Sequence, residues 1–131
     1  MIMQYPAAMV NHMWDAGANA LVHAASRSNG EWTGDQLKML LMRGELLLIG
    51  SSDLWAAVVI NTHPNKRSLH IYAVACTQGG NGINAADIAE LGEYAKSMGC
   101  TSMTCAADMA AERLYARYGF ERQYTIMEIG L

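Results

Sequence analysis

The chain has 131 residues, of which 52% are hydrophobic and 16% charged, so we expect one globular domain spanning residues 1–131. Its longest aliphatic run, "LWAAVVI", is too short to cross a bilayer, and the first ten residues lack the basic leader of a signal peptide. The net charge of −3, without a run of lysine or arginine, disfavours a nucleic-acid partner.

The cysteines and histidines indicate neither disulfides nor a metal site. Cys76, Cys100 and Cys105 form no C-x-x-C pair, and we expect them to be buried reduced thiols of a cytoplasmic protein. The four histidines show no paired ligand spacing, which disfavours a structural zinc site.

Two helices are predicted at the amino terminus. Apolar residues at helical spacing indicate a helix from Pro6 to about Ser26. After a break at residues 28–32, Thr33 and Gln36 form a capping-box pattern that begins a second helix, and Gly44 ends it.

Three strands are predicted next, at residues 45–51, 54–63 and 69–77. They are short, rich in branched and aromatic residues, and separated by turn formers. The turn-rich "HPNKRS" between the last two predicts an antiparallel hairpin.

The carboxyl-terminal half adds a second pattern. A helix at 84–98, capped by Asn84 and ended by Gly99, precedes a strand at 100–106. A helix at 108–118, capped by Asp108 and ended by Gly119, precedes a final strand at 120–130. The order α-α-β-β-β-α-β-α-β predicts an α/β fold with a mixed, mostly antiparallel sheet flanked by helices.

The glycine-rich turn "QGGNG" at residues 78–82 has three interpretations. Residues 80–85 satisfy the dinucleotide-binding pattern G-x-G-x-x-A, although such a turn normally follows the first strand of a parallel sheet. The turn also suits a tight strand-to-helix connection with positive φ, capped by Asn84. The third interpretation is a loop that binds a pyrophosphate.

A family resemblance supports the third interpretation. The pattern Asp108-x-x-Ala111-x-x-Leu114-Tyr115-x-x-x-Gly119-Phe120, placed after a strand, a glycine turn, a helix and a strand, resembles the GNAT superfamily of acyl-CoA-dependent N-acyltransferases. The resemblance implies a single GNAT-like domain that takes acetyl-CoA as its co-substrate and no metal. The residues that it assigns to coenzyme binding are Val74, Cys76, Gly79, Gly80, Asn81, Gly82, Asn84 and Asp108.

The pyrophosphate loop departs from the family pattern Q/R-x-x-G-x-G/A. Aligned on the helix, Gly79 stands where Arg or Gln is usual, and Asn84 where Gly or Ala is usual. Asn84 as a cap would occupy a backbone donor, and Asp87 in the first turn would repel a pyrophosphate. We expect these departures to weaken coenzyme binding without altering the fold.

The resemblance also assigns the chemistry. It implies that Tyr115 protonates the departing thiolate and that backbone N–H groups of Val74 and Cys76 stabilise the oxyanion. Strand alternation predicts His70, Tyr72, Val74 and Cys76 on one face, with His70 as a candidate base. For Tyr115 and His70, packing against neighbours remains an alternative.

The acceptor is expected to be a small-molecule or peptide amine. The loop charges of Glu31 and Asp53 would attract a cationic amine, with solvated surface charges as the alternative interpretation. The sequence leaves two functions open. One is an acetyl-CoA-dependent N-acyltransferase that acts on a primary amine. The other is a non-catalytic GNAT-like binding or assembly protein of a phage-associated kind. In either case "YTIMEI" at residues 124–129 offers an edge through which a homo-oligomer would form.

Overall fold

The computed structural model describes residues 1–52, 54–77 and 83–131. Its core is one five-stranded sheet with the strands in chain order. All neighbouring strands pair antiparallel except the last two, which are parallel, so the expected fold class is confirmed. The strands are β1 (Met3–Tyr5), β2 (Leu47–Gly50), β3 (Leu54–His63), β4 (Lys66–Cys76) and β5 (Ser102–Cys105).

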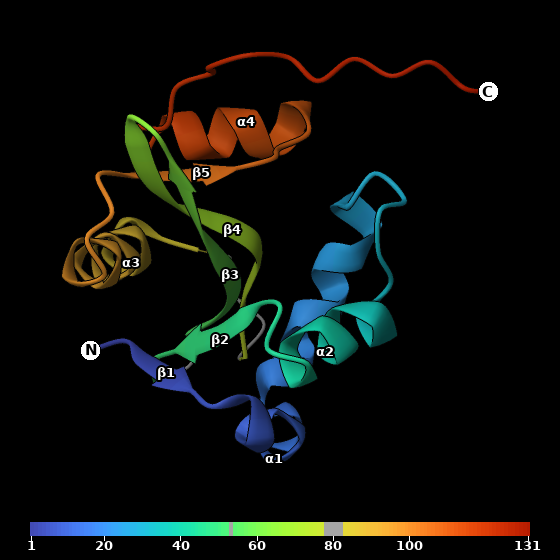
Figure 1. Cartoon of the computed structure of the whole chain (residues 1–131), viewed down its shortest axis with the longest axis vertical. Helices are drawn as coiled ribbons and strands as arrows, with labels where there is room; N and C mark the ends of the chain where they lie inside the picture. The colour runs from blue at the N-terminus through green and yellow to red at the C-terminus, as the bar shows by residue number, and fades with distance from the viewer. Residues whose placement is uncertain (53, 78–82) are drawn as a thin grey trace.

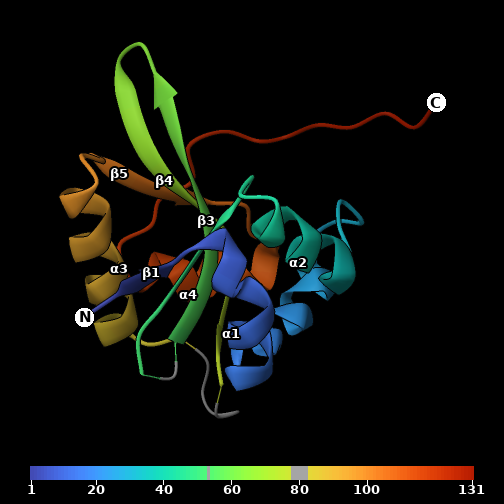
Figure 2. The same cartoon turned by 60° about the horizontal axis from the view of Figure 1, so that its bottom comes forward.

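Helices cover both faces of this sheet (Figures 1 and 2). On one face, buried residues including Leu21, Leu37 and Ala57 form a core under the amino-terminal helices. On the other, Leu69, Leu91 and neighbouring residues form a second core under α3. The helical elements are η1 (Ala7–Met9), α1 (Val10–Ala16), η2 (Ala18–Arg27), α2 (Gly34–Met42), α3 (Ala85–Ser97) and α4 (Met109–Ala116), where η denotes a 3-10 helix.

The predicted helix over residues 6–26 is broken into three pieces. Gly17, with φ of 144°, ends α1, and the chain continues as the 3-10 helix η2. A Cβ at Gly17 would lie 3.0 Å from Oγ1 of Thr77 and 3.1 Å from Nε1 of Trp55. Gly17 therefore allows a close approach between the helices and the ends of β3 and β4. The short strand β1 was not predicted, since three residues carry too little periodicity.

Local signals in the rest of the chain predicted element boundaries well. The Thr33–Gln36 capping box is present, and Asn84 caps α3 with Asp87 as its reciprocal partner. Gly44, Gly99 and Gly119 follow their helices with φ of 76°, 78° and 96°. These residues terminate helices because only glycine adopts such a backbone readily.

The predicted final strand is wrong. Residues 120–131 belong to no helix or strand and, apart from the partly buried Phe120, are exposed. In both views this segment runs away from the domain (Figures 1 and 2). Its composition favours a strand, but in this conformation it pairs with neither edge strand of the sheet, β1 or β5.

Candidate active site

The two parallel strands of the sheet share only a short paired stretch. Pairing between β4 and β5 runs from Ser68–Ser102 to Ile71–Cys105, where β5 ends. Strand β4 continues through Tyr72–Cys76, of which Ala73–Cys76 pair with β3 on one side. Among the described strands, none lies on the other side of Tyr72–Ala75, which we call the open stretch of β4.

A bulge sits where this open stretch begins. Ala57 faces Ala73 and the next residue, Val58, faces Ile71, so Tyr72 has no partner on β3. A bulge re-aims the side chains that follow it. Ile71 and Val74 accordingly both pack into the core under α3, three positions apart.

The bulge corrects one expectation from strand alternation. Cys76 packs on the α3 side with Val74. His70 lies on the opposite face from Ile71 and hence from these two residues. The predicted single face that includes His70, Tyr72, Val74 and Cys76 is therefore wrong, because one extra residue reverses the alternation.

His70 and Tyr72 nevertheless lie together. Their rings meet edge-on, with centroids 5.3 Å apart. Nδ1 of His70 forms a hydrogen bond of 2.8 Å with Oγ1 of Thr104 on β5. Burial lowers the pKa of His70, an effect that the Glu31 carboxylate partly opposes. His70 is thus a neutral imidazole near pH 7, a state that can accept a proton.

Tyr115 lies on α4, close to the end of β5. Its half-buried ring packs against Phe120 at a centroid distance of 5.4 Å. Burial raises the pKa of Tyr115, and the nearby Cys105 thiol raises it further. The phenol therefore keeps its proton at neutral pH. Since Cys105 follows Thr104, Tyr115 and His70 both lie near the point where β5 stops.

At the start of α4, the Asp108 carboxylate accepts hydrogen bonds from two residues. Its Oδ1 accepts a 2.8 Å hydrogen bond from the Ala111 amide, which confirms the N-cap assignment. Arg27, at the end of η2, donates Nη1 to both carboxylate oxygens at 3.1 Å. Sequence reasoning missed Arg27 because 81 residues separate the pair. The guanidinium offsets the negative charge that Asp108 would otherwise present to an anionic ligand.

The amino terminus of α3 faces the same end of the sheet as the open part of β4. The amide of Asn84 donates to Oδ2 of Asp87 at 3.0 Å, and the amide of Asp87 donates to Oδ1 of Asn84 at 2.9 Å. The first four N–H groups of a helix lack intrahelical partners. The Asn84–Asp87 capping box occupies two of them in α3. Within the described residues, those of Ala85 and Ala86 have no intrahelical acceptor and are the two that a ligand would use.

Tyr118 fixes this helix start relative to α4. Its hydroxyl donates a 2.9 Å hydrogen bond to the carbonyl of Ile83, the residue before Asn84. On the strand side, Nε1 of Trp55 donates to Oγ1 of Thr77, just after β4. Both ends of the glycine-rich connection are therefore anchored. The candidate residues Gly79, Gly80, Asn81 and Gly82 lie outside the described residues, as does Asp53.

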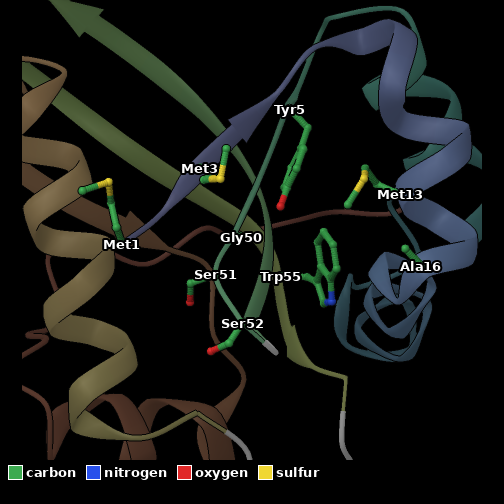
Figure 3. Close-up of a pocket in the computed structure, with 9 residues that line it drawn as sticks. All are labelled: Met1, Met3, Tyr5, Met13, Ala16, Gly50, Ser51, Ser52 and Trp55. Atoms are coloured by element: carbon green, nitrogen blue, oxygen red, sulfur yellow. The ribbon is translucent and has the colours of Figure 1, made fainter.

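A cavity of about 310 Å³ lies elsewhere, at the β1 edge of the sheet (Figure 3). The rings of Tyr5 and Trp55 lie close in it, with centroids 5.8 Å apart. It contains neither His70 nor Tyr115. Its lining residues are Met1, Met3, Tyr5, Met13, Ala16, Gly50, Ser51, Ser52 and Trp55.

Within the described residues, no three His, Cys, Asp or Glu side chains are grouped so that they would hold a metal ion. No helix in that part of the chain combines the length and apolar character needed to span a membrane.

Solved structures of acetyltransferases have the same fold. The chain matches ribosomal-protein-alanine N-acetyltransferase from Brucella melitensis with a TM-score of 0.67 at 14% identity, over 100% of this chain and 99% of that one. It matches the aminoglycoside N-acetyltransferase AAC(6')-Iy, solved in complex with CoA, with a TM-score of 0.61 at 15% identity, over 100% and 93%. It matches glucosamine-6-phosphate N-acetyltransferase from Arabidopsis thaliana with a TM-score of 0.62 at 15% identity, over 99% of this chain and 97% of that one.

At these identities the likeness shows the fold alone, and the expected GNAT-like fold is confirmed. No protein-family model matches the sequence, and no curated protein matches it.

Proposed function

We propose that the chain is an acyltransferase that moves an acetyl group from acetyl-CoA to a primary amine. The observation that carries this proposal is the open stretch of β4, bulged at Tyr72 and extending past the end of its parallel neighbour. Alternate N–H groups of a strand paired on one side face the unpaired side. There they would bind the pantetheine amides and the thioester carbonyl, as we infer for Val74.

The pyrophosphate of the coenzyme would lie at the start of α3. A helix amino terminus binds phosphate through free N–H groups and the positive end of its dipole. The amides of Ala85 and Ala86 supply such groups, and Gly79–Gly82 and Asn84 complete the proposed loop. The solved complex of a protein with this fold and CoA supports that assignment.

The reaction would use three groups of this chain. His70, directly or through a water, would take a proton from the amine, which Glu31 helps to attract. The amine nitrogen would then bond to the thioester carbonyl carbon, and strand amides would stabilise the oxyanion. As the C–S bond breaks, Tyr115 would give its phenolic proton to the CoA thiolate. Its raised pKa keeps that proton in place until then.

One observation favours a second function, that of a non-catalytic GNAT-like binding or assembly protein. The Asn84–Asp87 box uses two donors of the α3 terminus and places a carboxylate in its first turn. Both features disfavour a pyrophosphate. In that case the fold would persist without turnover.

Release of CoA thiol from acetyl-CoA, measured with a panel of small amines, separates the two functions. Tyr115→Phe should lower kcat about 100-fold, the lower end of a general-acid contribution, with KM for acetyl-CoA within about twofold. Tyr94→Phe is the matched control, because its hydroxyl binds Gln4, remote from the site. Absence of turnover in the unmodified chain, or equal losses in the two variants, would contradict the catalytic proposal.

A further inference from the structure

The imidazole of His70 is held by β5 as well as by its own strand. Nδ1 of His70 and Oγ1 of Thr104 lie 2.8 Å apart, and the two residues are direct partners in the parallel β4–β5 register. Both side chains are half-buried. The ring of Tyr72, from the same strand as His70, meets the imidazole edge-on. A hydrogen bond at Nδ1 and an aromatic contact therefore fix the ring together.

The same two strands carry a second contact between polar side chains. Oγ of Ser68 and Oγ of Ser102 lie 2.8 Å apart, two positions earlier in the register. Ser68 and His70 point to the same face of β4, because two positions separate them and the bulge comes later. The two contacts thus tie the same strands together in the same way, but only the one at His70 involves a group that can accept a proton.

A hydroxyl can bind a neutral imidazole in two ways. Thr104 can accept a hydrogen bond from Nδ1–H, which leaves the lone pair on Nε2, or it can donate its own proton to Nδ1, which leaves Nε2 protonated. A neutral imidazole has one lone pair that takes a proton, and in the second arrangement the threonine already occupies it. The direction of this one hydrogen bond therefore decides whether His70 can act as a base.

The surroundings of the ring favour the first arrangement. Among the described residues, none forms a hydrogen bond with Nε2, so that nitrogen is left for water or a ligand. Thr104 is half-buried rather than enclosed, so its oxygen can accept Nδ1–H while its own O–H proton is donated to water. The Glu31 carboxylate raises the pKa of His70 and therefore stabilises the imidazolium that forms when Nε2 takes a proton.

We propose that Thr104 is a positioning residue for His70: its hydroxyl accepts the hydrogen bond from Nδ1–H and so holds the imidazole with the lone pair of Nε2 free. The purpose of this arrangement rests on the proposed function, in which that lone pair takes a proton from the acceptor amine. The arrangement itself is a property of the free chain, so it can be measured without turnover.

Nitrogen-15 NMR of the histidine side chains tests the arrangement directly. At about pH 8 the ring is neutral, and the resonances of its two nitrogens show which one carries the proton. The signals of His70 are those that disappear in His70→Gln, and we expect a single tautomer protonated at Nδ1. Thr104→Val keeps a branched strand residue but lacks the hydroxyl, so the Nε2-protonated form should appear. Thr104→Ser should keep the proton on Nδ1.

Kinetics with acetyl-CoA and an amine test the consequence. Thr104→Val should lower kcat by about 10- to 100-fold, the usual cost of removing the partner that orients a histidine, with KM for acetyl-CoA within about twofold. Thr104→Ser should recover most of that loss. Ser102→Ala is the matched control, because it removes the other side-chain hydrogen bond from the same strand pair. It should leave kcat within about twofold and the tautomer of His70 unchanged.

Three results would overturn the inference: a proton on Nε2 of His70 in the unmodified chain, a tautomer that Thr104→Val does not change, or equal losses of kcat in Thr104→Val and Ser102→Ala. Failure of the proposed function looks different. A chain without turnover that still holds the Nδ1-protonated tautomer through Thr104 would contradict acyl transfer and support the positioning of His70. A chain that turns over with Nε2 protonated would contradict the positioning alone.

Discussion

Asp87→Asn should shift protein stability and coenzyme affinity in opposite directions. Asp87 lies at the third position of α3 and accepts a hydrogen bond from the amide of Asn84. Asparagine keeps an acceptor oxygen there but removes the charge. Only the electrostatic part of the Asp87 contribution therefore changes.

The stability loss follows from the helix dipole. A carboxylate at an exposed helix amino terminus contributes about 0.3–1 kcal/mol, so the variant should unfold about 1–5 °C lower. The affinity gain follows from removing a like charge. We take the Asp87 carboxylate to lie roughly 6–8 Å from a phosphate, with a dielectric constant between that of a protein surface and that of bulk water. Its repulsion then weakens the binding free energy by on the order of 0.5–2 kcal/mol. Binding of acetyl-CoA should therefore tighten by about 2- to 30-fold.

Calorimetric titration at low salt measures the affinity, and a thermal melt measures the stability. Glu93→Gln is the matched control, because it removes one exposed charge from the same helix, two turns further along. Its affinity change should be much smaller and screened by salt. Equal affinity in Asp87→Asn and the unmodified chain would refute a pyrophosphate site at this helix start.

Three further predictions concern the fold and His70. Burial lowers the pKa of His70 from 6.5, so the unfolded chain binds more protons below that pH and stability declines as the solution is acidified. His70→Gln should reduce this decline in urea unfolding between pH 7 and pH 5. Gly17→Ala should lower the free energy of unfolding by about 1–3 kcal/mol, since φ is 144° and the added Cβ would crowd Thr77. Gly44→Ala, which has open space around the added Cβ, should lower it less in the same urea unfolding assay. Leu91→Ala, at a fully buried position, should cost about 2–5 kcal/mol in denaturant unfolding, and a smaller loss would contradict the assignment of Leu91 to the core.

Much of the fold was predictable because local signals and tertiary packing agree. The caps at Thr33, Asn84 and Asp108 each involve residues within four positions of one another, so the local sequence predicts them. The final strand failed for the opposite reason. Residues 124–129 favour a strand, but a strand also needs a partner edge, and local sequence does not say where that edge is.

The sequence and the family resemblance named candidate residues for the site but not their arrangement. Tyr115 was proposed because it matches the family pattern between Asp108 and Gly119. The sequence did not predict which side chains of β4 share a face, because the bulge at Tyr72 depends on pairing with β3 rather than on residue type. Arg27 and Thr104 were missed since their partners, Asp108 and His70, are distant in sequence.

The central claim is that the open end of β4 and the start of α3 together hold an acyl-coenzyme A. Titration of labelled protein with acetyl-CoA, followed by NMR of the backbone amides, tests it most directly. The account predicts saturable shifts at Tyr72–Cys76 and at Ala85 and Ala86, with little change in β1. Absence of shifts at millimolar ligand, or shifts confined to the cavity around Tyr5 and Trp55, would contradict it.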